Sequence, residues 1–150
     1  MRLIPVASMV VLVAACAGAE GPQYHQGTMV VSSPAAWRTT GDGPVTIGFR
    51  VANTGEVDEV LRAVGLPSGE ALELHSAGPT GMERLDSLVI PAGEVVQLGL
   101  GGPHVMTGDV PIVAKPGDTL SVVLEFAGAG NLVIPVPLLQ FSEARERLRH

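Results

Sequence analysis

Two histidines and two methionines lie within a short stretch of the chain, and all four offer neutral nitrogen or sulfur ligands. They are His75, Met82, His104 and Met106. His104 and Met106 are two residues apart, so in an extended strand their side chains point to the same side. His75 and Met82 flank six residues that include two glycines and a proline, a length that can close a loop. We therefore expect the four side chains to converge at one rim of the fold.

Two imidazoles and two thioethers make a ligand set that selects copper(I). Thioether sulfur prefers soft ions, whereas zinc, magnesium and calcium favour harder or anionic ligands. A monovalent ion held by neutral ligands also leaves little charge to compensate when it is buried. The remaining candidates, His25, His150 and Met29, are isolated from this cluster in the sequence. We interpret those three as ordinary surface histidines and a core methionine.

The first residues have the features of an export signal. Arg2 is followed by an uncharged stretch, residues 3–15, which is shorter than a membrane-spanning helix needs. Two alanines precede Cys16, the only cysteine, an arrangement that resembles the lipobox of bacterial lipoproteins. We predict a signal peptide over residues 1–15, lipidation of Cys16, and an exported domain anchored to a membrane in the periplasm or cell envelope. The alternative is an ordinary signal peptide and a free thiol.

Composition and charge restrict the class of protein. The chain has 150 residues, 46% of them hydrophobic, which suits one domain with one core. The net charge of −6 argues against a nucleic-acid partner. No carboxylate pair or Ser-His-Asp spacing indicates catalysis, and with Cys16 tied to lipid the domain has no thiolate for a blue-copper centre. We therefore do not expect an enzyme.

Alternation of apolar and polar residues predicts the strands that must position the four ligands. The segments with this pattern are residues 45–51, 72–75, 96–100, 120–126 and 132–138, and residues 28–32 are a candidate first strand. Turn residues separate them at 53–55, 91–93 and 115–118. Pro135 and Pro137 lack backbone donors, so the last segment belongs at a sheet edge. Regular short strands between turns predict an all-β, Greek-key β-sandwich.

These patterns divide the chain into consecutive parts. After the signal peptide we expect a tether over residues 16–27, a copper-binding β-sandwich over residues 28–141 and a short tail over residues 142–150. In the tail we predict a short helix that begins with Ser142 as its N-cap and then frays.

The ligand spacing resembles that of the periplasmic copper chaperone family PCuAC. The family pattern is His, a spacer, Met, 21 residues, then His-x-Met, and here 21 residues separate Met82 from His104. Flanking segments between residues 29 and 138 are similar as well: Trp37, Asn53-Thr54-Gly55, Glu73-Leu74-His75, residues 90–94, 115–118 and 124–126. The resemblance implies a cupredoxin-like sandwich that binds copper(I) through His75, Met82, His104 and Met106.

The resemblance also implies a function. It implies a metallochaperone that passes copper to a recipient protein or assembly factor, toward the dinuclear copper centre of cytochrome c oxidase. Separately, we expect a monomer that touches the membrane only through its lipid. Two features depart from the family: the spacer of six residues between His75 and Met82 is short, and the tail has one His and no Met for a second site. Two alternatives remain, namely copper buffering or resistance without delivery, and a structural envelope lipoprotein with an incidental His/Met cluster.

Overall fold

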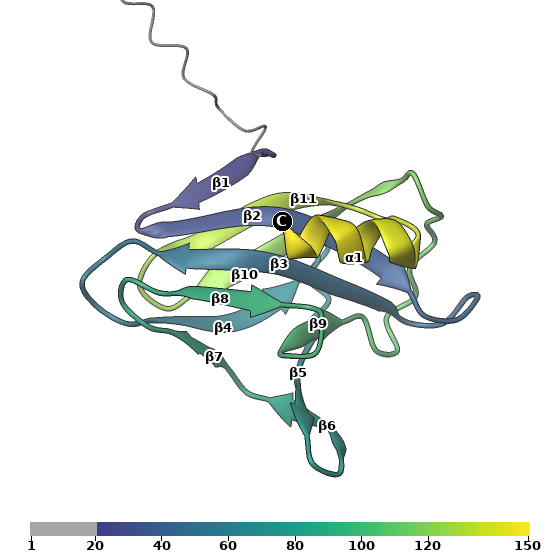
Figure 1. Ribbon diagram of the computed structural model, residues 1–150, viewed down its shortest axis with the longest axis horizontal. Helices are drawn as coiled ribbons and strands as arrows, with labels where there is room; N and C mark the ends of the chain where they lie inside the picture. Colours follow the sequence, from purple (N-terminus) through teal and green to yellow (C-terminus); the bar gives the residue numbers. More distant parts are fainter. Residues whose placement is uncertain (1–20) are drawn as a thin grey trace, which may run out of the picture.

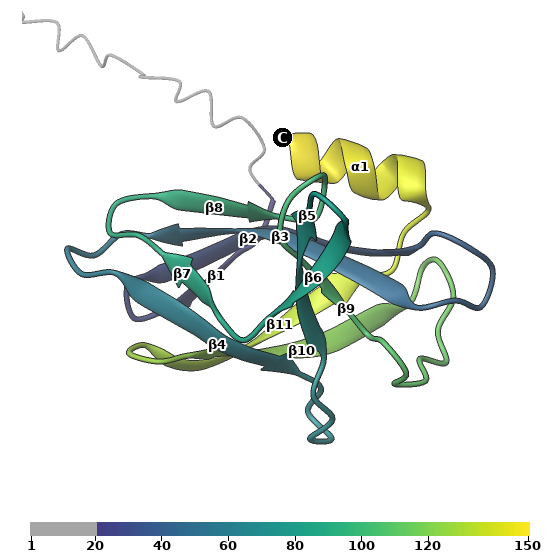
Figure 2. The ribbon, with the colours of Figure 1, turned by 90° about the horizontal axis from the view of Figure 1, so that it is seen from below.

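The computed structural model describes residues 21–150, whose strands form two facing sheets (Figures 1 and 2). The predicted signal peptide and Cys16 lie outside the described residues. The first sheet has seven strands in the order β1-β2-β3-β9-β5-β6, with β8 also paired to β3. The second sheet has four strands in the order β11-β10-β4-β7. The prediction of an all-β sandwich is confirmed.

The strand bounds follow the predicted segments closely in most places. The first sheet contains β1 (Gln23–Gln26), β2 (Met29–Arg38), β3 (Val45–Asn53), β5 (Glu73–Gly78), β6 (Gly81–Leu85), β8 (Val95–Leu98) and β9 (His104–Met106). The second contains β4 (Glu59–Gly65), β7 (Leu88–Ile90), β10 (Thr119–Phe126) and β11 (Gly130–Pro137). One helix, α1 (Phe141–Arg149), follows the last strand.

The core lies between the two sheets and is built from alternate strand residues. In β3, Ile47 and Phe49 are fully buried, and Val122 and Leu124 of β10 are buried in the same cluster. Each such side chain removed from water contributes roughly 1.5–3 kcal/mol. Strand β11 pairs only with β10 and lies at the edge of its sheet. This is the position that Pro135 in the middle of β11 requires.

Both ends of the described chain differ from the prediction. Residues 23–26 fall in the range predicted as a tether, yet they form β1 and pair with β2. Helix α1 begins after Gln140 rather than after Ser142, because the Glu143 carboxylate accepts a hydrogen bond from the Gln140 backbone N–H at 3.3 Å. The helix also does not fray after its first turn, since Ala144 and Leu148 are buried against the first sheet.

Helix α1 covers part of the outer face of the first sheet (Figure 2). Its buried residues, Ala144 and Leu148, form a second apolar cluster with Trp37 of β2. Gly48 of β3 permits this close approach, because a Cβ there would lie 2.9 Å from the Leu148 Cδ1 and 2.7 Å from the Leu98 carbonyl oxygen. The covering explains why β3 is buried on both faces near its start, although its alternation predicted one solvated face. Within residues 21–150 no helix has the length and apolar character needed to cross a bilayer.

Candidate metal centre

The segment predicted as a loop between His75 and Met82 is a tight β-hairpin. Ala77 of β5 pairs with Met82 of β6, and Gly78 pairs with Gly81, so only two residues connect the strands. Gly81 has a φ of +124°, a conformation that only glycine adopts without strain. His75 is therefore the third residue of β5 rather than the last residue of a strand. The hairpin projects from the body of the sandwich (Figure 1).

Strand β9 places His104 directly opposite His75 of β5. The two imidazole centroids are 5.7 Å apart, and the rings meet at an interplanar angle of 78°. Between the two ligand candidates of β9, Val105 is fully buried and pairs with the core residue Leu74. His104 and Met106 consequently share the outer face of the sheet, as their spacing predicted.

The His104 ring lies between a backbone carbonyl and a thioether. Its Nδ1 is 3.0 Å from the Gly102 carbonyl oxygen, and its Nε2 is 3.2 Å from the Met82 sulfur. Because a carbonyl oxygen only accepts hydrogen bonds, we assign the proton of the neutral ring to Nδ1. The Nε2 lone pair then faces the sulfur lone pairs with no proton between them. Two electron-pair donors in this arrangement match what a soft cation requires.

His75 is held from its other side by an acidic residue of the same strand. Its Nε2 lies 3.2 Å from the Glu73 carboxylate, and its side chain is 15% exposed. Its Nδ1 is buried and, within the described part of the chain, has no hydrogen-bond partner. Leaving such an atom unsatisfied costs about 1–3 kcal/mol. With Nε2–H donating a hydrogen bond to the Glu73 carboxylate, the Nδ1 lone pair is available to a metal ion.

The fourth candidate, Met106, is placed by strand register. It pairs with Glu73 of β5 and Thr46 of β3, two residue pairs along the sheet from the two histidines. Met82 is 60% exposed at the rim, whereas His75 is largely buried. The structure thus gathers His75, His104 and Met82 and sets Met106 beside them on the same face.

Within the described chain, the other His and Met residues lie elsewhere. Met29 is fully buried in the main core. His25 pairs with Val30 in the β1–β2 hairpin, and His150 follows the end of α1. Over residues 21–150, no three His, Cys, Asp or Glu side chains gather as a metal site.

Glu73 is a site residue that the sequence interpretation did not single out. Besides His75, its carboxylate lies 3.8 Å from the Arg84 guanidinium across the hairpin. The signal for it is the spacing Glu73-Leu74-His75, which puts the acid and the imidazole on one face of a strand. Glu73 does not replace any of the predicted ligands, but it orients one of them.

Comparisons with known proteins agree with this architecture. The family of LpqE-like lipoproteins matches residues 29–138, whereas no curated protein matches the chain. The chain is similar to the copper-bound PCuAC domain from PmoF2, with 21% identity, a TM-score of 0.70, and coverage of 80% of this chain and 99% of that one.

Two further solved domains have the same fold. The apo PCuAC domain of PmoF2 is 21% identical with a TM-score of 0.68, covering 79% of this chain and 95% of its own. The apo PCuAC domain from PmoF1 is 22% identical with a TM-score of 0.67, covering 78% and 98%. The predicted resemblance to PCuAC domains is confirmed at the level of the fold, and with it the cupredoxin-like sandwich.

Proposed function

The chain belongs to the LpqE-like lipoprotein family, and from this premise we propose that it is an exported carrier of copper(I). The observation that supports this most directly is the 3.2 Å approach of the His104 Nε2 to the Met82 sulfur. The shared fold adds support, because one of the similar solved domains is described as copper-bound. The ion is the cargo of this protein.

The proposed ligands divide into inner and outer groups. His75 and His104 are held by hydrogen bonds to Glu73 and to the Gly102 carbonyl, so they form the fixed side of the site. Met82 is exposed at the rim, where a ligand from another protein can displace it first. A neutral thioether is a weak enough ligand to leave in this way. The carrier would therefore release copper stepwise, beginning at Met82.

A copper(I) competition titration tests the binding claim. The predicted mature chain should bind one equivalent, and a variant with Met82→Leu and Met106→Leu should lose that binding because both thioethers are gone. Met29→Leu is the matched control, since it makes the same change at a buried core methionine and costs less than about 1.5 kcal/mol in stability. Unchanged binding in the double variant would show that the sulfurs are not ligands.

X-ray absorption at the copper edge counts the neighbours of the bound ion. The proposal predicts both sulfur and nitrogen neighbours, with sulfur lost in the double methionine variant and retained in Met29→Leu. A ligand that binds tightly to the native state must raise the unfolding temperature. If the chain is instead a structural envelope lipoprotein with an incidental His/Met cluster, copper(I) should leave that temperature unchanged.

We further propose delivery of the ion to an extracytoplasmic recipient, such as the dinuclear copper centre of cytochrome c oxidase, from a lipid anchor at Cys16. A deletion strain grown at low copper separates delivery from buffering. Reduced oxidase activity, restored by the wild-type gene and not by the Met82→Leu/Met106→Leu variant, supports delivery. Normal oxidase activity in the deletion strain would leave buffering as the role.

A further inference from the structure

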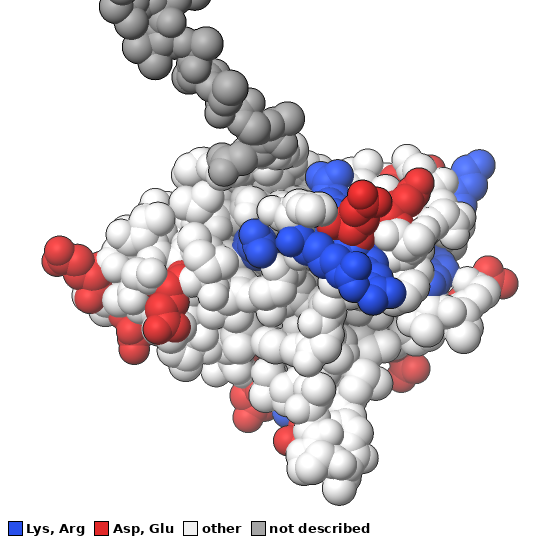
Figure 3. Space-filling model, in the orientation of Figure 1, with Lys and Arg blue, Asp and Glu red and all other residues white. Residues whose placement is uncertain are grey.

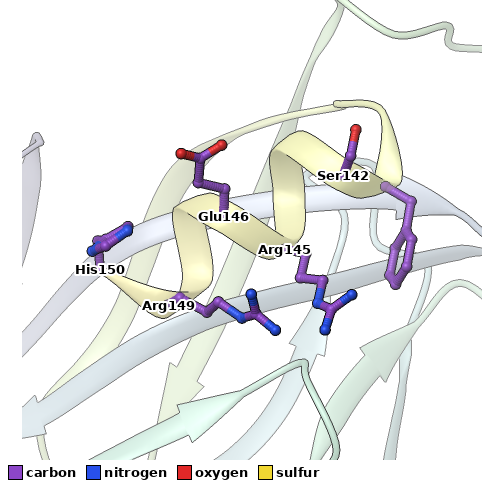
Figure 4. A pocket seen from close by; sticks show the side chains of 6 residues that line it. Ser142, Arg145, Glu146, Arg149 and His150 are labelled. Carbon is purple, nitrogen blue, oxygen red and sulfur yellow. The ribbon is translucent and has the colours of Figure 1, made fainter.

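Helix α1 carries three exposed residues in a line, Phe141, Arg145 and Arg149, here called the α1 stripe. They are spaced four residues apart, so they share one face of the helix. Phe141 is 50% exposed, and both arginines are exposed. Figure 4 shows the Arg145 and Arg149 side chains extending from the same side of α1, and all three residues line one shallow groove. An exposed aromatic residue beside two guanidinium groups is unusual on an otherwise acidic chain.

The region around the α1 stripe is more basic than the chain as a whole. The net charge of the chain is −6, yet Figure 3 shows a band of basic side chains across the position of α1. Arg50 of β3 adds to it, since its guanidinium donates to the His150 carbonyl oxygen at 3.3 Å and so lies at the end of the helix. Glu143 and Glu146 are also on α1, and Glu146 lines the same groove as the stripe, with its side chain extending from the other side of the helix than Arg145 and Arg149 in Figure 4.

The α1 stripe lies near the point where the described chain begins. Figures 1 and 2 both place the C-terminal end of α1 close to the start of β1. The hairpin with Met82 projects at the lower edge of Figure 1, away from the start of β1. Cys16 and Gln23 are seven residues apart in the sequence, which spans at most about 25 Å when fully extended. A lipid on Cys16 would therefore hold the α1 side of the domain close to the bilayer.

We propose that the α1 stripe contacts anionic phospholipid headgroups when the domain is anchored at Cys16. This rests on the lipid anchor of the proposed function and is independent of copper binding. Guanidinium groups form paired hydrogen bonds with phosphate, and a neighbouring aromatic ring is suited to the interface between headgroups and acyl chains.

The test uses the chain from Cys16 onward, coupled through this single cysteine to a maleimide lipid in vesicles. All strands, α1 and both core clusters lie within residues 21–150, so this chain keeps every described contact. Trp37 is the only tryptophan and lies beneath Phe141, with the ring centroids 6.1 Å apart. Energy transfer from Trp37 to dansyl-labelled headgroups therefore reports how close the α1 stripe is to the bilayer.

Transfer should be stronger in vesicles that contain phosphatidylglycerol than in phosphatidylcholine alone, and salt should weaken it. Arg145→Ala with Arg149→Ala should reduce the ratio of membrane-facing to free orientations about thirty-fold, the value expected for two basic residues at an anionic surface. Arg62→Ala with Lys115→Ala is the control, because it removes the same charge from exposed positions outside α1 and should leave transfer unchanged.

Equal transfer in neutral and anionic vesicles would overturn the proposal, as would equal losses in the two double variants. Equal transfer in both lipids would instead favour an acidic protein as the partner of the stripe. Because coupling is made in vitro, the result does not depend on lipidation in the cell. Copper(I) titration of the same variants reports separately on the proposed carrier function, which neither double variant should alter.

Discussion

The Glu73→Gln substitution tests whether the contact between Glu73 and the His75 Nε2 controls metal binding. The carboxylate of Glu73 lies 3.2 Å from Nε2, and this contact keeps the proton on Nε2 and leaves the Nδ1 lone pair free for the proposed ion. A glutamine has the same shape, but its amide is neutral and can donate as well as accept. The substitution therefore weakens the preference for the ring form whose Nδ1 lone pair is free.

The size of the effect follows from the kind of hydrogen bond that is lost. A hydrogen bond to a charged group contributes about 1.5–3 kcal/mol, and a neutral one about 0.5–1.5 kcal/mol. The difference, about 1–1.5 kcal/mol, corresponds to a dissociation constant roughly five- to twelve-fold higher. Because the Glu73 side chain is 34% exposed, we expect a value near the lower end of the 10–100-fold range that residues behind metal ligands typically show.

Competition of the variant against a copper(I) chelator measures this change directly. Glu83→Gln is the matched control, since Glu83 lies on the same hairpin and pairs with Ser76, on the face opposite to His75. We expect Glu83→Gln to bind copper(I) as the wild type does. An unchanged dissociation constant in Glu73→Gln, or the same increase in both variants, would refute the orienting role and leave only a general effect of charge.

Two further predictions concern the scaffold. Burial raises the pKa of Glu59, but hydrogen bonds from the backbone N–H groups of Val60, Gly128 and Ala129 outweigh it, so the pKa lies below its ordinary value. The resulting stability is present above the ordinary pKa and is lost as pH falls through the lowered one, so Glu59→Gln should cost about 1.5–3 kcal/mol at neutral pH and less in acid. Urea unfolding at both pH values checks this, and an equal loss at both would contradict it. Gly48→Ala should destabilise the domain by about 1–3 kcal/mol and change Trp37 fluorescence, because the new Cβ meets Leu148 of α1. Gly102→Ala, where a Cβ meets nothing closer than 3.8 Å, should have little effect on stability.

Sequence patterns located the strands whose one face is buried between the sheets. In β3 and β10 the inward residues alternate strictly, and Ile47 and Val122 are fully buried as expected. The outer face of β3 was less predictable, because Thr46 and Gly48 read as solvent-facing positions. Gly48 is covered by Leu148 of α1, and the only buried residues of that helix are Ala144 and Leu148, too few to form a recognisable apolar stripe.

The metal site was predictable in its residue types but not in its pairing. His and Met spacing identified the candidate ligands, yet nothing local to the sequence aligns His75 with His104. Their strands, β5 and β9, are separated along the chain by three other strands, so this register is set by tertiary pairing. The sequence predicts a loop in place of the β5–β6 hairpin, because residues 76–78 are small and lack strand preference. The backbone ladder forms there without help from the side chains.

The tight turn of the β5–β6 hairpin has a consequence for the kinetics of exchange. Ligands carried on a long loop must be gathered from many conformations before a metal can be held, and that entropy is lost at each loading event. Here the two-residue connection and the β5–β9 ladder fix the relative positions of His75, Met82 and His104 in the folded chain. Loading and release then need only ligand substitution and small side-chain rotations. Such a preorganised site would exchange its ion quickly without being a weak binder.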